Sequence, residues 1–168
     1  MSTPALGPVE LLDPDRHDTA RFSSDVEVLD HWLRRVAPVA AAAGTAATWV
    51  LCRGRRVVGF YALAMGSIER IRVPSRPGRG QPDPTRSQCS SSLAWRSPPG
   101  PGTGLGGDLL LDALIRSVAG ARHYGARALV VDAIDDRVAE FYGHHGFLPL
   151  EGRRLYRRIS DIARALGV

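Results

Sequence analysis

A glycine-rich turn at the start of a long amphipathic helix constrains the fold of this chain more than any other feature. The turn consists of Gly102, Thr103, Gly104, Leu105, Gly106 and Gly107, and DLLLDALIRSVAGAR follows it. Apolar residues recur in that run at helical spacing, so the helix must bury one face. Glycines can turn backbone amides toward one point at the positive end of the helix, which favours a phosphate or pyrophosphate. Without supporting context, a flexible linker before a helix explains such a turn better.

The N-terminal half predicts a helical segment followed by a β-hairpin. Residues 24–36 have the capping-box spacing and apolar periodicity of an amphipathic helix. We expect Pro38 to interrupt or restart this helix and Gly44 to end it. Residues 48–52 and 56–69 are β-rich runs on either side of a tight glycine-containing turn, which predicts an antiparallel hairpin.

The C-terminal half predicts alternating strands and short helices. The run ARALVVDA, residues 126–133, is apolar and β-branched, as in a buried strand. Asp135 can cap a short helix that Gly146 ends. FLPL and RRLYRRI predict a further pair of strands, and Ser160 can begin a last short helix.

Composition fits one domain and excludes several chemistries. The 168 residues include no apolar run long enough for a bilayer span, and the N-terminus shows no secretory signal, so we expect a cytoplasmic protein. All 22 basic residues are arginine, and the lack of lysine excludes a P-loop or a Schiff-base enzyme. The net charge of +5 favours an anionic partner, although a solvated basic surface explains it equally well.

The helix over residues 136–145 ends in residues that could carry chemistry. Phe141 and Tyr142 are neighbours, so they point about 100° apart on a helix, and we expect Phe141 in the core and Tyr142 facing a cleft. A phenol stays protonated at neutral pH and could reprotonate a thiolate as a general acid. His144 and His145 cannot chelate from one helix face, so we predict no metal site.

Residues 70–101 differ in kind from the rest of the chain. They hold most of the prolines, a serine run and almost no aliphatic residue after Val73. Alone, such a stretch predicts a disordered loop, yet a loop of this length is unusual inside a compact domain.

GTGLGG also satisfies the G-x-G-x-x-G pattern of a dinucleotide-binding domain, with Asp132 placed as a ribose-binding acid. That motif must follow a strand and open the first βαβ unit. Here SPPGP precedes it and too few residues follow for a doubly wound sheet, so this reading is the remote alternative.

Five blocks taken in order resemble the GNAT superfamily of acyl-CoA N-acyltransferases. They are RFSSDVEVLDHWLRR, GFYALAMGSIE, GTGLGGDLLLDALIRS, GARALVVDAID and AEFYGHHGFLPL. Together they are most similar to the GNAT toxins of bacterial type II toxin–antitoxin pairs. The resemblance implies a single α+β domain with a mixed central sheet and flanking helices.

The resemblance also implies a reaction: acetyl transfer from acetyl-CoA to the α-amine of an aminoacyl-tRNA, which blocks translation. Residues 102–107 would hold the CoA pyrophosphate through their backbone amides, and Tyr142 falls at the family's functional tyrosine, as acid to the departing thiolate. The family's usual partner is a ribbon-helix-helix antitoxin, and a homodimer is implied.

The chain departs from the family's pattern just before the glycine-rich turn. Pro101 stands three residues before Gly104, where GNAT motifs have Gln or Arg. RSQCSSSLAWRSPP replaces an apolar strand whose backbone pairs with the pantetheine arm and supplies an amide to the thioester oxyanion. A one-base frameshift converts serine codons of the TCN type to apolar ones, so we predict that Ser87 to Ser97 is a frame-shifted reading of this strand, poorly folded as written.

Two other functions remain open at this point. One is a GNAT acetyltransferase for small amines or protein N-termini. The other is a non-catalytic remnant that binds only an antitoxin or nucleic acid.

Overall fold

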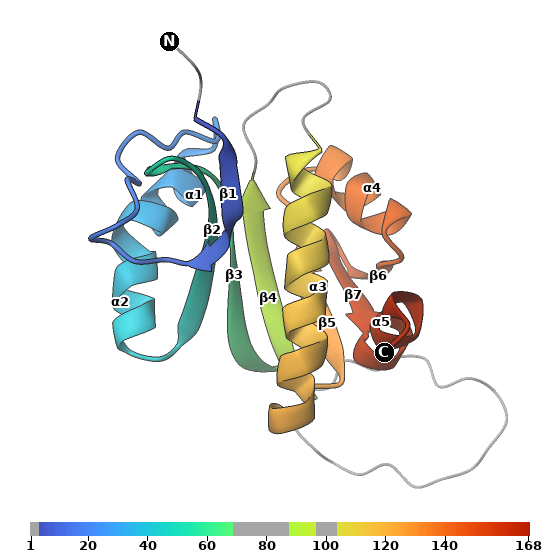
Figure 1. Cartoon of the computed structure of the whole chain (residues 1–168). Coiled ribbons are helices and arrows are strands. Elements are labelled where there is room, and N and C mark those ends of the chain that lie inside the picture. Colours follow the sequence, from blue (N-terminus) through green and yellow to red (C-terminus); the bar gives the residue numbers. More distant parts are fainter. Residues whose placement is uncertain (1–3, 69–87, 97–103) are drawn as a thin grey trace, which may run out of the picture.

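One mixed sheet of seven strands runs through the molecule (Figure 1). The computed structural model describes residues 4–68, 88–96 and 104–168. The strands lie in the order β1-β2-β3-β4-β5-β7-β6. Their bounds are Leu6–Leu11 (β1), Ala46–Arg53 (β2), Arg56–Ile68 (β3), Gln88–Arg96 (β4), Ala128–Asp132 (β5), Leu148–Glu151 (β6) and Arg154–Arg158 (β7). The β4–β5 pair is parallel and the other five pairs are antiparallel, which confirms the predicted mixed sheet.

Helices cover both faces of this sheet. Successive residues of β2 point to opposite faces and belong to different core clusters. Val50 packs with Leu33 of the N-terminal helical segment, and Leu51 packs with Leu109 of the long helix. Each face is therefore sealed by a separate apolar layer. The helical elements are α1 (Glu27–His31), the π-helical turn η1 (Trp32–Val36), α2 (Ala37–Ala42), α3 (Leu105–Tyr124), α4 (Asp136–His144) and α5 (Ile159–Leu166). Within the described residues, none of these helices has the length and apolar character needed to cross a membrane.

The N-terminal helical segment forms where expected, with a different cap. The hydrogen bonds before the helix go to Asp30 rather than to a residue at capping-box spacing. Asp30 Oδ1 accepts from the backbone N of Ser24 at 2.9 Å and from Ser24 Oγ at 2.6 Å. The wider π-helical turn precedes Pro38, which lacks an amide hydrogen, and the helix restarts there as α2. Gly44 follows the end of α2 with φ +68°, as predicted for a C-terminal stop.

The hairpin and the C-terminal half confirm the sequence periodicity. β2 and β3 pair in antiparallel fashion around Gly54, whose φ is +61°. The Asp135 carboxylate accepts the backbone N–H of Val138 at 2.8 Å, so it caps α4 as predicted. α5 begins at Ile159, one residue before the expected Ser160.

Two strands were not predicted. β1 includes Gly7 and Pro8, which obscure its pattern, and it lies at the sheet edge where proline is tolerated. β4 corrects the expectation that residues 88–96 lack the central strand: their backbone pairs with β3 on one side and β5 on the other. Two neighbouring strands leave backbone donors and acceptors that must be met, and a polar segment can meet them.

The sheet topology also excludes the dinucleotide-binding alternative. A doubly wound domain needs a mostly parallel sheet. Here the strand before the glycine-rich turn is antiparallel to β3, and β5 is antiparallel to β7.

Candidate functional site

The N-terminus of α3 presents backbone amides beside open space. Gly104 caps the helix with φ +62°, a left-handed conformation that favours glycine. Helical hydrogen bonding begins with Gly107 N donating to Gly104 O at 3.0 Å, so the amides of Leu105 and Gly106 precede the first intrahelical donor. Among the residues that the structure describes, none outside the glycine's own stretch of helix lies within 4 Å of a Cβ added at Gly104 or Gly107. This cradle fits a pyrophosphate, because donors and room for the ligand occur together.

The parallel strands β4 and β5 stop pairing before β4 ends, at the end of the sheet where α3 begins (Figure 1). Their ladder ends where Leu93 pairs with Val131, yet β4 continues to Arg96, which pairs with Phe60 of β3. The chain after β5 stays with the other side of the sheet, since Ala133 N donates to Arg153 O at 2.9 Å. The carboxyl ends of adjacent parallel strands are a common ligand site in open sheets.

Helix α4 carries Tyr142 to the same end of the sheet. In Figure 1, α4 lies beside the N-terminal end of α3. Tyr142 belongs to one core cluster with Leu105 and Leu109 of α3. The turn after α4 is a Schellman motif: Phe147 N donates to Tyr142 O at 3.1 Å and Gly146 N to Gly143 O at 3.0 Å.

The burial of the two neighbouring aromatics is the reverse of the prediction. Tyr142 is only 1% exposed, whereas Phe141 is half-buried and packs against the edge of that cluster. The Tyr142 ring contacts Phe147 with a centroid separation of 5.3 Å, the apolar contact that accompanies a Schellman turn. Tyr142 thus lies in the core rather than facing a cleft, and helical phase alone could not show which of the two neighbours points inward.

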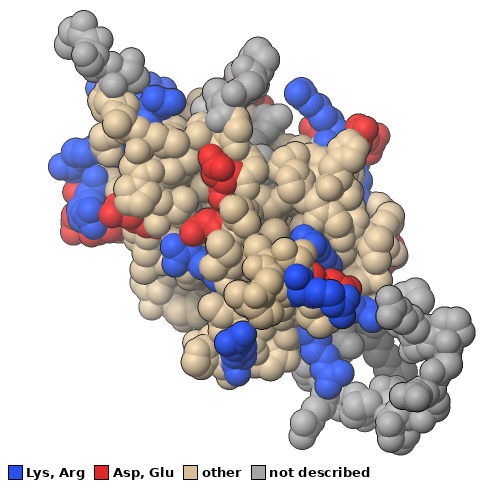
Figure 2. Space-filling model, turned by 45° about the vertical axis from the view of Figure 1, so that its right-hand side comes forward, with Lys and Arg blue, Asp and Glu red and all other residues tan. Residues whose placement is uncertain are grey.

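Arginines near this end of the sheet are held by exposed ion pairs. Arg154 Nε lies 2.7 Å from Asp132 Oδ1 at the end of β5, and Arg153 Nε lies 2.9 Å from Asp136 Oδ1 on α4. The hydrogen bond to Asp132 raises the pKa of the Arg154 guanidinium. Figure 2 shows arginines spread over this face between wide uncharged areas. Exposed pairs of this kind contribute little stability and can exchange for other anions.

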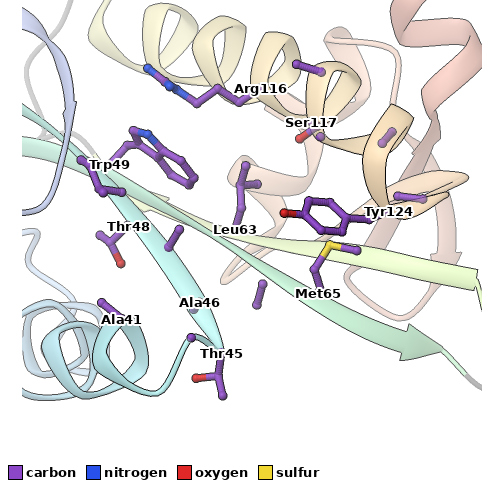
Figure 3. Close-up of a pocket in the computed structure, with 18 of the residues that line it drawn as sticks. Ala41, Thr45, Ala46, Thr48, Trp49, Leu63, Met65, Arg116, Ser117 and Tyr124 are labelled. Carbon is purple, nitrogen blue, oxygen red and sulfur yellow. The ribbon is translucent and has the colours of Figure 1, made fainter.

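A cavity of about 600 Å³ lies elsewhere, between α3, β2 and β3 (Figure 3). It is lined in part by Trp49, Met65, Arg116 and Tyr124. Arg116 stacks over the Trp49 ring at 5.2 Å and pairs with Asp112 at 2.8 Å. At about 1.5 Å per helical residue, Arg116 lies roughly 18 Å along α3 from the glycine cradle. The cavity is therefore separate from the candidate site.

The structure brings together four of the six predicted phosphate-binding residues and Tyr142. Gly104, Leu105, Gly106 and Gly107 form the start of α3. Gly102 and Thr103 lie outside the described residues. Sequence reasoning missed the backbone of β4, whose serine run hid its strand character. It also missed the Schellman turn, although the spacing of Tyr142, Gly146 and Phe147 could have indicated it.

Comparisons with known proteins agree with this geometry. No protein-family model matches the chain. The tRNA-acetylating toxin of Mycobacterium tuberculosis is 41% identical over 154 residues, covering 90% of this chain and 92% of that protein. The protein described as probable toxin TacT of Sinorhizobium fredii is 30% identical over 176 residues, covering 95% and 94%.

Solved structures have the same fold. AtaTR bound with acetyl-CoA gives a TM-score of 0.81 at 25% identity and covers 96% of this chain and 98% of its own. AtaT complexed with acetyl-methionyl-tRNAfMet gives 0.82 at 23% identity, with 96% and 99% covered. From the two sequence relatives along nearly its whole length, together with this shared fold, the chain belongs to the family of tRNA-acetylating GNAT toxins.

Proposed function

We propose that this chain transfers the acetyl group of acetyl-CoA to the α-amine of an aminoacyl-tRNA and thereby blocks translation. The observation that carries the proposal is the convergence of three features at one end of the sheet. These are the amides at the start of α3, the separated ends of β4 and β5, and Tyr142 in the adjoining core. The M. tuberculosis relative, at 41% identity, supports the same substrate class.

In this proposal the backbone binds acetyl-CoA. The amides of Gly104, Leu105 and Gly106 hold the pyrophosphate, joined by those of Gly102 and Thr103 of the same motif, and Gly107 leaves room for it because it has no side chain. The last residues of β4 pair with the pantetheine arm between the strand ends. The acetyl thioester that acetyl-CoA supplies then lies toward the carboxyl ends of the parallel strands. No metal takes part in the scheme.

The acyl transfer needs one well-placed acid and no strong base. An α-amine has a pKa near 8, so a sizeable fraction is neutral and nucleophilic at physiological pH. Its nitrogen forms a bond to the acetyl carbon, the carbon–sulfur bond breaks, and the amine proton leaves to solvent. The Tyr142 hydroxyl gives its proton to the departing thiolate and regains one from solvent. Hydrogen bonds of this kind often tighten only in the substrate complex, so the burial of Tyr142 in the free protein is compatible with this role.

The tRNA is expected to contact the arginines near Tyr142. Arg153 and Arg154 are half-exposed in ion pairs that can exchange for phosphate. The net charge of +5 gives a long-range attraction to the same ligand. Both proposed substrates occur in the cytoplasm, so we place the protein there.

A small ribbon-helix-helix antitoxin is the proposed protein partner, and the toxin itself is proposed to form a homodimer. One solved neighbour is an AtaT mutant bound to the C-terminus of its antitoxin AtaR. A disordered tail that folds over the acetyl-CoA site would exclude substrate. Co-expression of the neighbouring gene should relieve growth arrest, and persistent arrest would contradict the antitoxin proposal. Light scattering of the purified toxin tests the dimer.

The experiment that tests the proposed substrate compares acceptors under identical conditions. Purified chain and radiolabelled acetyl-CoA are incubated with charged tRNA, deacylated tRNA, a free amino acid and an unblocked peptide. We expect label on charged tRNA alone. Equal or faster labelling of the free amino acid or the peptide would favour an acetyltransferase for small amines or protein N-termini. Failure to bind acetyl-CoA at any workable concentration would favour a non-catalytic remnant.

A further inference from the structure

Arg157 on β7 reaches the turn that ends α4. It pairs across the sheet with Leu129 of β5, and its Nη1 donates to the carbonyl oxygen of His145 at 2.9 Å. Its guanidinium also covers Gly146: a Cβ built on that glycine would lie 3.1 Å from Arg157 Nε and 3.2 Å from Cζ. Gly146 has φ +82°, so both its conformation and the arginine above it require glycine.

The turn that Arg157 covers is the one that holds Tyr142. Two hydrogen bonds of this turn are accepted by the Tyr142 carbonyl oxygen, from His145 N at 3.0 Å and from Phe147 N at 3.1 Å. The rings of Tyr142 and Phe147 are in contact across the same turn. Main chain and ring of Tyr142 are therefore both fixed by residues 145–147, which Arg157 ties to the sheet.

Arg157 does this work as a donor to backbone rather than as half of an ion pair. Within the part of the chain that the structure describes, no carboxylate lies within salt-bridge distance of it. A cation at a helix C-terminus also complements the partial negative charge of the last carbonyls. The flat guanidinium can bond the His145 carbonyl and lie against Gly146 at once, whereas a lysine ammonium could do only the first.

We propose that Arg157 is the positioning residue for Tyr142 in acyl transfer. This inference rests on the proposed function, in which Tyr142 is the acid. Without the contacts of Arg157 to His145 and Gly146, the turn after α4 can shift. The Tyr142 hydroxyl then no longer lies at the required distance from the leaving sulfur. Small misplacements of this kind cost as much as about 100-fold in rate.

The test compares Arg157→Gln and Arg157→Lys with a control, Arg164→Gln. Arg164 is an exposed arginine on α5 whose ion pair with Asp161 is 3.4 Å long, so the control loses the same charge. We expect kcat for charged tRNA to fall about tenfold or more in both Arg157 variants. The KM for acetyl-CoA should stay within about twofold, because the pyrophosphate cradle is untouched. The control should retain parent kcat.

A double-mutant cycle separates positioning from a general loss of structure. If Arg157 acts through the Tyr142 hydroxyl, Arg157→Gln should lower kcat in the parent and have no further effect in Tyr142→Phe. An equal drop in both backgrounds, or no drop in the parent, would overturn the inference. A Tyr142→Phe variant that keeps the parent kcat would instead overturn the proposed acid. Arg157→Lys keeps the charge at the end of α4, so it answers the question should Arg157→Gln fold poorly.

Discussion

The Tyr142 hydroxyl is the single group on which the proposed chemistry depends most. Tyr142→Phe removes one oxygen and almost no volume, so the buried ring should keep its contact with Phe147. We expect kcat to fall about 10²- to 10⁴-fold, the usual contribution of a general acid, with a change in melting temperature of only a few degrees. Steady-state kinetics and a thermal melt check this. Unchanged turnover would show that the acid lies elsewhere.

Cys52 is expected to make the stability of the protein fall as the pH rises in the alkaline range. Burial, with a smaller contribution from the charge of Glu10, raises the pKa of this thiol from about 9 to about 11. A raised folded pKa gives stability that is complete below pH 9 and lost as pH rises toward 11, because only the unfolded thiol ionises in that window. A shift of this size corresponds to a loss of at most about 3 kcal/mol.

The matched variant for this effect is Cys52→Ala, which has no titrating group at that position. Urea unfolding of both proteins from pH 8 to 11 should show the parent losing more stability than Cys52→Ala above pH 9. Parallel curves would contradict the assignment.

At the scale of elements, a substitution at Gly107 should affect the stability of α3 and the binding of acetyl-CoA in opposite directions. Both Gly107 and Gly120 are inside α3, and no other part of the described chain lies within 4 Å of a Cβ at either position. Alanine at either position should raise stability by about 0.5 to 1 kcal/mol, since glycine is unfavourable in a helix. Only Gly107→Ala adds a methyl group where the pyrophosphate is proposed to bind. Calorimetry should therefore show weaker acetyl-CoA binding by Gly107→Ala and unchanged binding by Gly120→Ala; equal affinities would argue against the cradle.

Strand β4 has a serine-rich sequence although it lies at the centre of the sheet, where an apolar strand is expected. It lies between β3 and β5 in the centre of the sheet, with Ser90 to Ser92 paired opposite residues 128–130. We propose that Ser87 to Ser97 is a frame-shifted version of an apolar strand. Reading each triplet one base earlier turns TCN serines into apolar residues, and it lets Cys89 give Val or Met and Arg96 give Ala. Any run of TCN codons would shift to apolar residues, so the support for a frameshift comes from the positions that are not serine.

The coding DNA for residues 70–102 tests this proposal directly, together with a chain carrying the restored frame. Each fully buried apolar side chain contributes about 1.5 to 3 kcal/mol, so the restored chain should melt well above the chain as written and bind acetyl-CoA more tightly. Equal melting temperatures and equal affinities would refute the frameshift.

The sequence predicted the elements with strong periodicity and failed where context decides. The 3.6-residue pattern of α3 and the Asp135 cap are local signals, and both were correct. β4 forms because its two neighbours need a partner, which no local pattern in its serine run indicates. The resemblance to the family predicted Tyr142 as the functional residue. Its burial, however, depends on the turn through Gly146 and on Arg157, which lies more than ten residues further along the chain.

At the scale of the whole molecule, both substrates are proposed to meet at one end of the sheet. The glycine cradle, the separated strand ends and Tyr142 are contributed by α3, by β4 with β5, and by α4. The cavity lined by Trp49 and Arg116 belongs to the other half of α3. The acetyl group should accordingly be found on the amine that a charged tRNA presents at its 3′ end.

The measurement that tests this most directly is a mass spectrum of the 3′-terminal adenosine. Charged tRNA is treated with the unaltered chain and acetyl-CoA and then digested with a nuclease that leaves the aminoacyl ester intact. We expect aminoacyl-adenosine carrying one acetyl group on its α-amine, formed by the parent and much more slowly by Tyr142→Phe. Unmodified aminoacyl-adenosine after prolonged incubation with a chain shown to bind acetyl-CoA, or acetyl found on the nucleotides instead, would contradict it.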